Sequence, residues 1–267
     1  LSLAIDGQVL TPTLHRTQTP NPQLSLAIDG QGCFALLGPN GAGKTTTLGM
    51  LTGDLVPSAG EAWVAGFSVR TQMMRIFQLL GFCPQFGGLF PRGVSLKQHL
   101  QLFARLKGVA EADLEAHCAR VIAEFGLQEH EHKWVGKMSG GTRRKLTAAI
   151  ALACEPRVCF LDEPTTGVDV GTRQFLWERI RAKGRRGCAL ILTTHYMEEA
   201  DALAQRVGIM VNGQLQVLGS PQYLKSRHGG GYRVELKGPA ATAARAQAVV
   251  EALFPGTRRL EALDGYQ

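Results

Sequence analysis

The chain has 267 residues, of which 45% are hydrophobic and 19% are charged, and its formal net charge is +7. This composition suits one large α/β domain, or a domain with a subdomain, and excludes an intrinsically disordered chain. No apolar run approaches the ~18 residues that a membrane-spanning helix needs, and residues 1–23 lack the pattern of a signal peptide. The six cysteines form no C-x-x-C pair, so we expect buried, reduced thiols of a cytosolic compartment rather than a metal site.

The N-terminal segment contains the octapeptide LSLAIDGQ twice, at residues 1–8 and 24–31. Each copy alternates apolar and polar residues up to an Asp-Gly pair, which predicts a strand followed by a turn. Only the second copy leads directly into the apolar run 33–37, which suits a buried parallel strand. The sequence leaves open whether the first copy is natural.

A glycine-rich loop follows this strand, and residues 46–51 read as the start of a helix. The loop is Gly38-Pro39-Asn40-Gly41-Ala42-Gly43-Lys44-Thr45. It fits G-x-x-x-x-G-K-[ST] and is similar to the phosphate-binding loop of P-loop NTPases. Its backbone N–H groups and the helix N-terminus attract phosphate oxygens, Lys44 can reach the β- and γ-phosphates, and the Thr45 hydroxyl can bind Mg²⁺. The strand and helix flanks disfavour the alternative of a plain glycine-rich turn.

Residues 93–154 are the most helical part of the chain, after short β-like pieces at 62–65 and 80–84. Apolar side chains recur at helical spacing at positions 96, 100, 103 and 106, and again at 114, 118, 121, 122 and 125. The pattern predicts a helical insertion in an α/β core.

Strand signals return in the second half of the chain, at 158–161 and 189–193. Residues 207–218, with Asn212-Gly213 at their centre, predict a hairpin with a type I′ turn. A further piece follows, with a strand expected at 232–236 and a helix at 240–253.

Two carboxylates, Asp162 and Glu163, follow the apolar run 158–161. Ligands of an open parallel sheet bind at the carboxyl ends of its strands, so these side chains are expected at a binding edge. We expect Asp162 to hold Mg²⁺, directly or through water. We expect Glu163 to orient or deprotonate the attacking water, help that is worth about 10²–10⁴ in rate. The structural alternative is a helix N-cap at Pro164.

A second anion site is predicted at Ser139-Gly140-Gly141, at the start of a helix that runs to Cys154. Free N–H groups and a hydroxyl at a helix N-terminus attract phosphate. Taken alone, the triplet is more often a plain cap, but its position between the phosphate loop and the carboxylate strand favours a binding site. Because residues 38–45 already serve the phosphates of one nucleotide, the second site indicates a nucleotide bound by another copy.

Five motifs in this order resemble the nucleotide-binding domain of ATP-binding cassette (ABC) ATPases. They are GPNGAGKTT at 38–46, the loop at Gln85, MSGGT at 138–142, VCFLDEPTTGVD at 158–169 and LTTH at 192–195. The resemblance covers about residues 24–225. It implies an α/β, RecA-like P-loop NTPase core with an antiparallel β-subdomain and a helical subdomain inserted at about 86–154, within an ATPase domain at 1–225. Residues 226–267 resemble part of a C-terminal regulatory extension.

The resemblance also implies partners and residue roles. It implies a head-to-tail dimer with a second nucleotide-binding domain, two ATP molecules at the interface, and attachment to a transmembrane domain on the cytoplasmic face of a membrane. It implies that Asp169 lies in a loop communicating between the two sites and that His195 senses the γ-phosphate. The residues implied to be catalytic are Lys44, Gln85, Glu163 and His195. The residues implied to bind the nucleotide are Gly38, Pro39, Asn40, Gly41, Ala42, Gly43, Lys44, Thr45 and Thr46, together with Ser139, Gly140 and Gly141 of the second domain. The residues implied to bind Mg²⁺ are Thr45, Gln85 and Asp162.

Residues 82–86, 139–146 and 195–201 look like the A-subfamily, the lipid exporters, and are closer to its second cassette than to its first. Two features depart from the family. Thr142 replaces the usual glutamine or asparagine. Residues 1–32 hold no Phe, Tyr or Trp to stack on adenine, and His15 is the only ring there. Since such stacking is worth about 1–3 kcal/mol per base, we expect adenine to be held loosely.

The sequence therefore predicts an ATPase that converts ATP to ADP and phosphate and drives movement of a lipid-like cargo. One alternative is a soluble, non-transport cassette protein, although those usually carry paired cassettes or long coiled coils. Another is a nucleotide-gated regulatory module with little turnover, which the presence of Glu163, His195 and Gln85 disfavours. The basic clusters at 143–145, 181–186 and 258–259 are interpreted as a solvated face or as close to phosphate and anionic lipid, with no nucleic-acid partner.

Overall fold

The computed structural model describes residues 2–5, 12–13, 24–28, 30, 32–90 and 92–228, together with 245, 248–250 and 252–253. The chain divides into two units, Leu1–Ser226 and Arg227–Gln267. The strand expected at 232–236 lies outside the described residues, as does His15. In the second unit, the described residues of the helix expected at 240–253 are helical.

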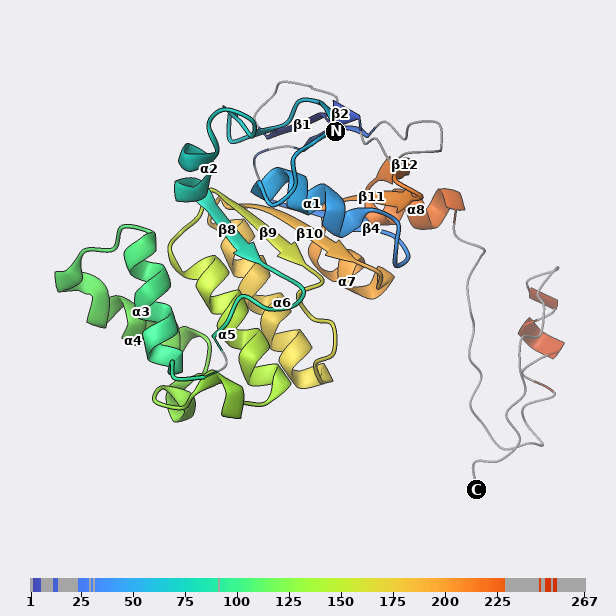
Figure 1. Ribbon diagram of the computed structural model, residues 1–267. Helices are drawn as coiled ribbons and strands as arrows, with labels where there is room; N and C mark the ends of the chain where they lie inside the picture. Colours follow the sequence, from blue (N-terminus) through green and yellow to red (C-terminus); the bar gives the residue numbers. More distant parts are fainter. Residues whose placement is uncertain are drawn as a thin grey trace. The chain divides into compact units, whose positions relative to one another are not determined.

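The first unit is built on a central six-stranded sheet with the order β12-β11-β4-β10-β9-β8 (Figure 1). Neighbouring strands are parallel, except that β12 pairs antiparallel with β11. The strands are β4 (Gly32–Leu37), β8 (Leu80–Cys83), β9 (Val158–Asp162), β10 (Ala189–Thr194), β11 (Arg206–Val211) and β12 (Gln214–Gly219). The carboxyl ends of β4, β10, β9 and β8 therefore lie side by side at one edge, where an open parallel sheet binds its ligands.

Helices cover both faces of this sheet. Figure 1 shows α1 on one face and α5, α6 and α7 on the other. The helices are α1 (Lys44–Thr52), α2 (Met73–Leu79), α3 (Leu96–Leu106), α4 (Leu114–Glu124), α5 (Gly140–Ala153), α6 (Val170–Arg185), α7 (Met197–Leu203) and α8 (Pro221–His228). Within the described residues, no helix has both the length and the apolar character required to cross a bilayer.

Three short strand pairs accompany the central sheet. β2 (Pro12–Thr13) and β5 (Ala59–Gly60) are antiparallel, as are β6 (Trp63–Val64) and β7 (Phe67–Ser68). The two octapeptide copies pair with each other through β1 (Ser2–Ile5) and β3 (Ser25–Ile28), and this pair is parallel with identical residues opposite one another. The two antiparallel pairs agree with the expected antiparallel subdomain, and the parallel β1–β3 pair is an addition to it.

The helical insertion confirms one predicted apolar face and corrects the other. In α4 and the residue that follows it, all five predicted positions are buried. In α3, Leu96 and Leu100 are buried but Leu106 is 71% exposed, and Ala104 is buried in its place. The buried row of α3 therefore advances four residues at a time, and Leu106 lies at the helix end, outside that row.

The predicted hairpin is confirmed at residues 206–219. Asn212 and Gly213 both have positive φ, 49° and 78°, which is the conformation that a type I′ turn requires at its two central residues. The hairpin supports the phosphate loop from behind, because the Gly213 N–H donates to the Ala42 carbonyl at 2.8 Å.

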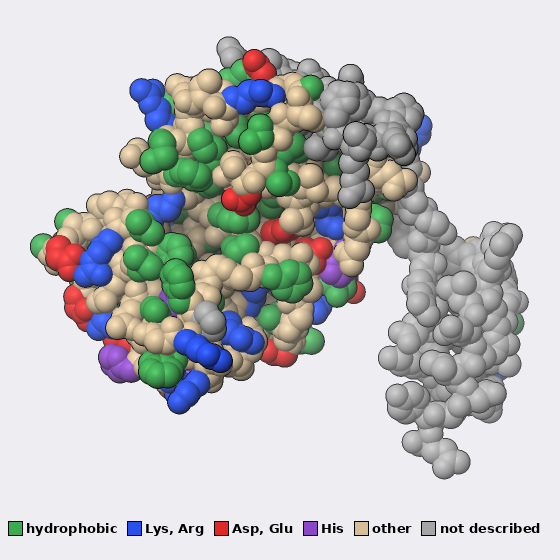
Figure 2. All heavy atoms as spheres, in the orientation of Figure 1, with side chains coloured by type: hydrophobic (Ala, Val, Ile, Leu, Met, Phe, Trp, Pro, Cys, Tyr) green, Lys and Arg blue, Asp and Glu red, His purple; other side chains and the backbone are tan. Residues whose placement is uncertain are grey.

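Charged side chains of both signs are intermixed on the face shown in Figure 2, and the described residues there form no single basic surface. Not every side chain of the basic clusters is solvated. Lys183 is 2% exposed, and its Nζ donates to Glu155 Oε1 at 2.6 Å. The interpretation of 181–186 as a solvated face is therefore wrong for Lys183, which packs its stem into the domain and keeps its charge paired.

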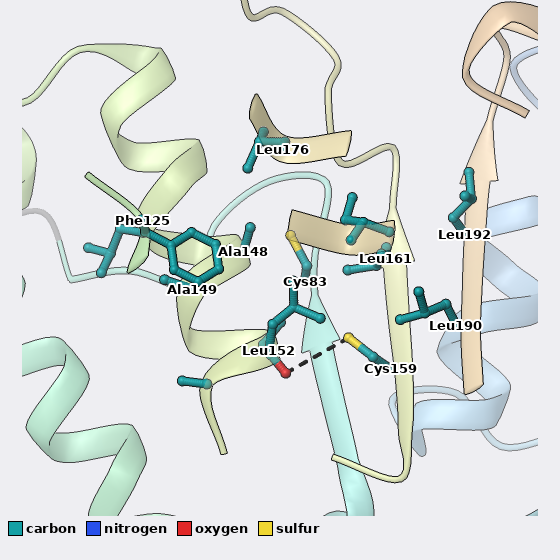
Figure 3. Packing of buried hydrophobic residues seen from close by; sticks show 14 of the residues in the cluster. Cys83, Phe125, Ala148, Ala149, Leu152, Cys159, Leu161, Leu176, Leu190 and Leu192 are labelled. Atoms are coloured by element: carbon teal, nitrogen blue, oxygen red, sulfur yellow. Dashed lines mark hydrogen bonds between the residues drawn. The ribbon is translucent and has the colours of Figure 1, made fainter. Parts of the chain in front are cut away.

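The two faces of the sheet carry separate hydrophobic clusters, as the two-residue period of a strand requires. Leu161 and Leu192 lie in the cluster that includes α5, α6 and α7, whereas Phe160 and Ile191 lie in the cluster that includes α1. Figure 3 shows the first of these, with Leu152 of α5 beside Cys83 and Cys159 of the strands.

The cysteines are free thiols, and five of the six are buried, as predicted. The exception is Cys154, which is partly exposed. Burial raises the pKa of Cys188 to about 12, and it also raises the pKa of Cys159, whose thiol points at the Ala151 carbonyl, 3.8 Å away. These groups therefore stay protonated at neutral pH and behave as small apolar side chains.

His99 of α3 joins the insertion to the loop that follows β8. Its side chain is buried, its Nε2 accepts from the Phe90 backbone N–H at 2.8 Å, and its Nδ1 lies 2.8 Å from the Ser95 carbonyl. This pairing uses a neutral ring with the proton on Nδ1. Burial lowers the pKa of His99 below its usual 6.5.

Acid is therefore expected to destabilise the domain partly through His99. The unfolded state binds the proton more readily, so the stabilisation is complete above pH ~6.5 and is lost as pH falls toward the lower folded-state pKa. Urea unfolding measures the free energy of unfolding at pH 7.5 and at pH 5.5. The decrease between the two pH values should be smaller for His99→Asn than for the wild type. His117, whose pKa is also lowered by burial, retains part of the dependence. The exposed His132→Asn is the control, and an equal pH effect in both variants would contradict this role.

Candidate functional site

The phosphate loop runs from the end of β4 to the start of α1, as predicted. Two of its glycines are required by geometry. A Cβ on Gly38 would lie 2.3 Å from the Met210 carbonyl oxygen, so no side chain fits there, and Gly43 has φ of 100° at the N-cap of α1. Lys44 is 5% exposed, and its Nζ donates to the Gly38 and Pro39 carbonyls at 2.8 and 3.1 Å. Its charge is therefore held inside the curl of the loop.

Asp162 ends β9 beside Thr45 and Thr193. Its Oδ1 accepts from the Thr45 hydroxyl at 3.2 Å and also from the Thr193 hydroxyl, and the carboxylate is 2% exposed. A hydroxyl and a carboxylate at this distance are hard oxygen donors of the kind that Mg²⁺ prefers. Among the described residues there is no group of three or more His, Cys, Asp or Glu that could hold a metal. This pair fits an ion that takes only one or two protein oxygens and completes its shell with phosphate and water.

Glu163 adopts a left-handed backbone conformation, with φ of 45°. Such a conformation in a non-glycine residue costs about 1–3 kcal/mol and persists where its surroundings hold it. Here the Glu163 N–H donates to the carbonyl and to the hydroxyl of Thr193, both at 3.1 Å. No helix begins at Pro164, and residues 163–167 form a bend and a turn. The alternative interpretation of this pair as a helix N-cap is therefore wrong.

Four side chains converge on the Glu163 carboxylate, which is itself buried. Gln85 Nε2 donates to Oε2 at 2.8 Å, and the Thr166 hydroxyl donates to the same oxygen at 3.1 Å. Lys44 Nζ lies 3.7 Å from Oε1, and His195 Nδ1 lies 3.3 Å from it. All four residues predicted as catalytic therefore lie within one cluster, although they are up to 151 positions apart in the chain (195 − 44).

The His195 Nδ1 is close to Glu163 but does not form a hydrogen bond with it. This nitrogen is buried and has no hydrogen-bond partner among the described residues. The ring packs against Tyr196, with 3.9 Å between ring centroids. A buried ring nitrogen without a partner costs free energy, and a ligand oxygen in the site would satisfy it.

The predicted trans residues lie at the start of α5, where Ser139 is the N-cap. Its Oγ accepts from the Thr142 N–H at 3.1 Å. Ser139 is therefore a helix cap, as the alternative interpretation expected, and this role does not exclude phosphate binding at the same helix start. Asp169 caps α6 in the same way, because its Oδ1 accepts from the Thr172 N–H at 2.9 Å. This hydrogen bond and a second one, from the Thr172 hydroxyl to Oδ2 at 2.7 Å, lower the pKa of Asp169. A Cβ on Gly141 would lie 3.3 Å from the Thr172 hydroxyl, so the two helix starts are adjacent.

Sequence reasoning missed two polar residues that brace the site. Arg144, assigned to a solvated cluster, is half-buried and bonds to backbone carbonyls around Gln85 and Glu163. Glu199, four residues after His195, is 2% exposed and accepts from the Thr165 hydroxyl at 2.7 Å and from the Trp177 indole N–H at 3.1 Å. Neither residue carried a sequence signal, because the partners of both lie far away in the chain.

Replacement of Glu199 by alanine is expected to lower the free energy of unfolding by about 1–3 kcal/mol, because the buried Thr165 hydroxyl and the partly buried Trp177 indole N–H would lose their acceptor. Urea unfolding checks this. Glu198→Ala is the matched control, since the neighbouring side chain is exposed. Equal stability of the two variants would show that Thr165 and Trp177 find other partners.

The parallel sheet, the phosphate loop at its carboxyl edge and the carboxylates beside it define a P-loop nucleotide-binding domain. Residues 22–166 match the family model described as ABC transporter. The chain belongs to this ABC transporter family.

Curated relatives confirm the resemblance to the A-subfamily. The chain is 45% identical to "Phospholipid-transporting ATPase ABCA7" of Homo sapiens over 91% of its own length. It is 41% identical to "Phospholipid-transporting ATPase ABCA3" of Rattus norvegicus over 88% of its length. It spans only 11% and 14% of these two proteins.

Solved structures agree on the fold. An "ATP binding subunit of ABC transporter" matches with a TM-score of 0.73 and 24% identity, over 91% of this chain and 100% of that one. A dimeric ATP-binding cassette in a post-hydrolysis state, bound to ADP and Pi, matches with a TM-score of 0.71 and 18% identity, over 80% of this chain and 99% of that one.

Proposed function

We propose that this domain binds and hydrolyses ATP to drive an ABC transporter that moves a phospholipid or a similar amphiphile across a membrane. The observation that carries the proposal is the cluster around Glu163. It joins the phosphate-loop lysine, Gln85 and His195 at the edge where a parallel sheet binds nucleotide. The names of the two relatives support the choice of phospholipid.

In this proposal some residues position the ATP and the attacking water, and others stabilise the negative charge of the phosphates. Residues 38–46 cradle the phosphates, and Lys44 moves its ammonium from the loop carbonyls to phosphate oxygens. Glu163 accepts the proton of a water that Gln85 helps to orient. The unpartnered His195 Nδ1 pairs with the γ-phosphate. Thr45 and Asp162, with Gln85, would hold a Mg²⁺ ion, which would supply positive charge against the phosphates.

A second copy, or a related cassette, completes the site in this account. Ser139, Gly140 and Gly141 offer the N-terminus of a 14-residue helix, which attracts anions. The fold neighbour that is a dimer bound to ADP and Pi supports pairing of two such domains, and in the proposed pair these groups act on the nucleotide of the partner. The domain then works at the cytoplasmic face of a membrane, against a transmembrane domain.

The proposal is tested in the transporter that contains this domain, purified and reconstituted in phospholipid vesicles. Mg·ATP should be hydrolysed, and a fluorescent phospholipid should change leaflet only when ATP is present. Glu163→Gln should stop both. Hydrolysis without lipid movement would support the proposed ATPase activity and contradict the proposed phospholipid cargo. ATP binding without turnover would favour the alternative of a nucleotide-gated regulatory module.

A further inference from the structure

The Arg144 side chain uses its full hydrogen-bonding capacity on two loops of the site. A guanidinium group carries five N–H donors: one on Nε and two on each Nη. In this structure Nε makes one hydrogen bond, and Nη1 and Nη2 make two each, all to backbone carbonyl oxygens. The acceptors are Pro164 at 2.6 Å, Pro84 at 2.6 Å, Gln85 at 3.3 Å, Asp162 at 2.8 Å and Glu163 at 2.5 Å.

These carbonyls flank the two residues whose side chains meet. The Pro84 and Gln85 carbonyls belong to the peptide groups on either side of the Gln85 Cα. The Asp162 and Glu163 carbonyls stand in the same relation to the Glu163 Cα. One guanidinium group therefore holds both peptide planes around each residue, and the two side chains hydrogen-bond to each other at 2.8 Å.

We propose that Arg144 is a positioning residue that fixes Gln85 and Glu163 as one unit and ties that unit to the start of α5. This inference rests on the proposed function, because positioning matters only where the Glu163 carboxylate is used. The strained Glu163 backbone, with φ of 45°, needs such support, since left-handed conformations persist only where neighbours hold them. Arg144 is the fifth residue of α5, the helix that begins after Ser139, so a shift of this helix would change the position of the Glu163 carboxylate.

The geometry requires arginine rather than a positive charge. A lysine ammonium offers three donors on one atom and cannot reach all five carbonyls from one position. Arg143, the preceding residue of α5, is exposed, and its side chain makes no hydrogen bond or ion pair among the described residues. It provides a matched control on the same helix.

Amide hydrogen exchange tests the proposal without requiring turnover. Arg144→Met is expected to speed exchange in segments 82–86 and 162–166 by roughly 10- to 100-fold, the effect of losing charge-assisted hydrogen bonds. The Glu163 and Thr166 amides, which donate to Thr193 and Glu163, should respond most. Helix α1 should be unchanged. Arg144→Lys should behave like Arg144→Met, and Arg143→Met like the wild type.

Phosphate release adds a readout that a purely structural role would not move. Arg144→Met should lower kcat by about 10²-fold, the scale of a small misplacement of reacting groups, and leave ATP affinity unchanged. In a chain that already carries Glu163→Gln, the same substitution should cost much less, because Arg144 acts through Glu163.

Three results of the exchange experiment on these segments would overturn the proposal. They are unchanged exchange in both segments, an equal effect of Arg143→Met, or full rescue by Arg144→Lys. Faster exchange throughout the domain with a lowered Tm would also do so, because it would reduce Arg144 to a general stabiliser. If the wild type releases no phosphate, the proposed function fails, and the exchange experiment still decides the role of Arg144.

Discussion

Replacement of Glu163 by glutamine is expected to reduce ATP hydrolysis by about 10²- to 10⁴-fold, the usual worth of a general base. Glutamine has nearly the same shape and can still face Gln85 and Thr166, which now donate to the carboxylate at 2.8 and 3.1 Å. It cannot accept a proton from water. ATP affinity should therefore be preserved, since Lys44 and the phosphate loop are untouched.

The same variant should accumulate in an ATP-bound dimer, because hydrolysis is the step expected to reopen the interface. Phosphate release measures the first effect, and sedimentation in Mg·ATP measures the second, with a species of twice the 28.8 kDa chain mass. Glu198→Gln, at an exposed position, is the control. Turnover equal to that of the wild type would remove Glu163 from the mechanism.

Replacement of Lys44 by methionine is expected to weaken ATP binding by about 10- to 100-fold, the effect of losing charge-assisted hydrogen bonds to phosphate. Methionine keeps the apolar stem but removes the ammonium group, which lies among the Gly38 and Pro39 carbonyls and 3.7 Å from Glu163. Hydrolysis should fall as well, because the charge that develops on the terminal phosphoryl group loses its nearest cation.

A fluorescent nucleotide titration distinguishes Lys44→Met from Glu163→Gln. The first should weaken binding and the second should not. Lys133→Met, at an exposed position outside the site, is the control. Unchanged affinity in Lys44→Met would mean that the lysine stays on the loop carbonyls when nucleotide binds.

Local patterns were enough to predict the fold class and the strand ends and helix starts on which the candidate site residues lie. The phosphate loop, the carboxylates after β9 and the Asn212-Gly213 hairpin each depend on residues adjacent in sequence. The fold class follows from their order. Three sequence-distant residues, Lys44, Gln85 and His195, meet at Glu163 because the parallel strands end at one edge, so the topology of the sheet brings them together.

The bracing contacts could not be predicted in this way. Arg144 and Lys183 stand in basic clusters that resemble a solvated surface, and only the packed structure reveals their partners. Glu199 and His99 are polar side chains whose burial depends on donors distant in sequence or in a neighbouring loop. The prediction that Leu106 is buried was wrong for a related reason. A helical period predicts which face of a helix is apolar, but not how far along the helix that face is covered by other parts of the domain.

In the proposed dimer, each ATP lies between the phosphate loop of one chain and the start of α5 in another. Mixing two inactive variants tests it directly. Lys44→Met disables the phosphate loop, and Gly140→Asp places a carboxylate at the start of α5, where a Cβ meets no atom within 4 Å. A mixed dimer would retain one site with both halves intact. Phosphate release by the mixture should be well above the sum of the two separate rates. A mixture no more active than that sum would show that the two half-sites do not act together.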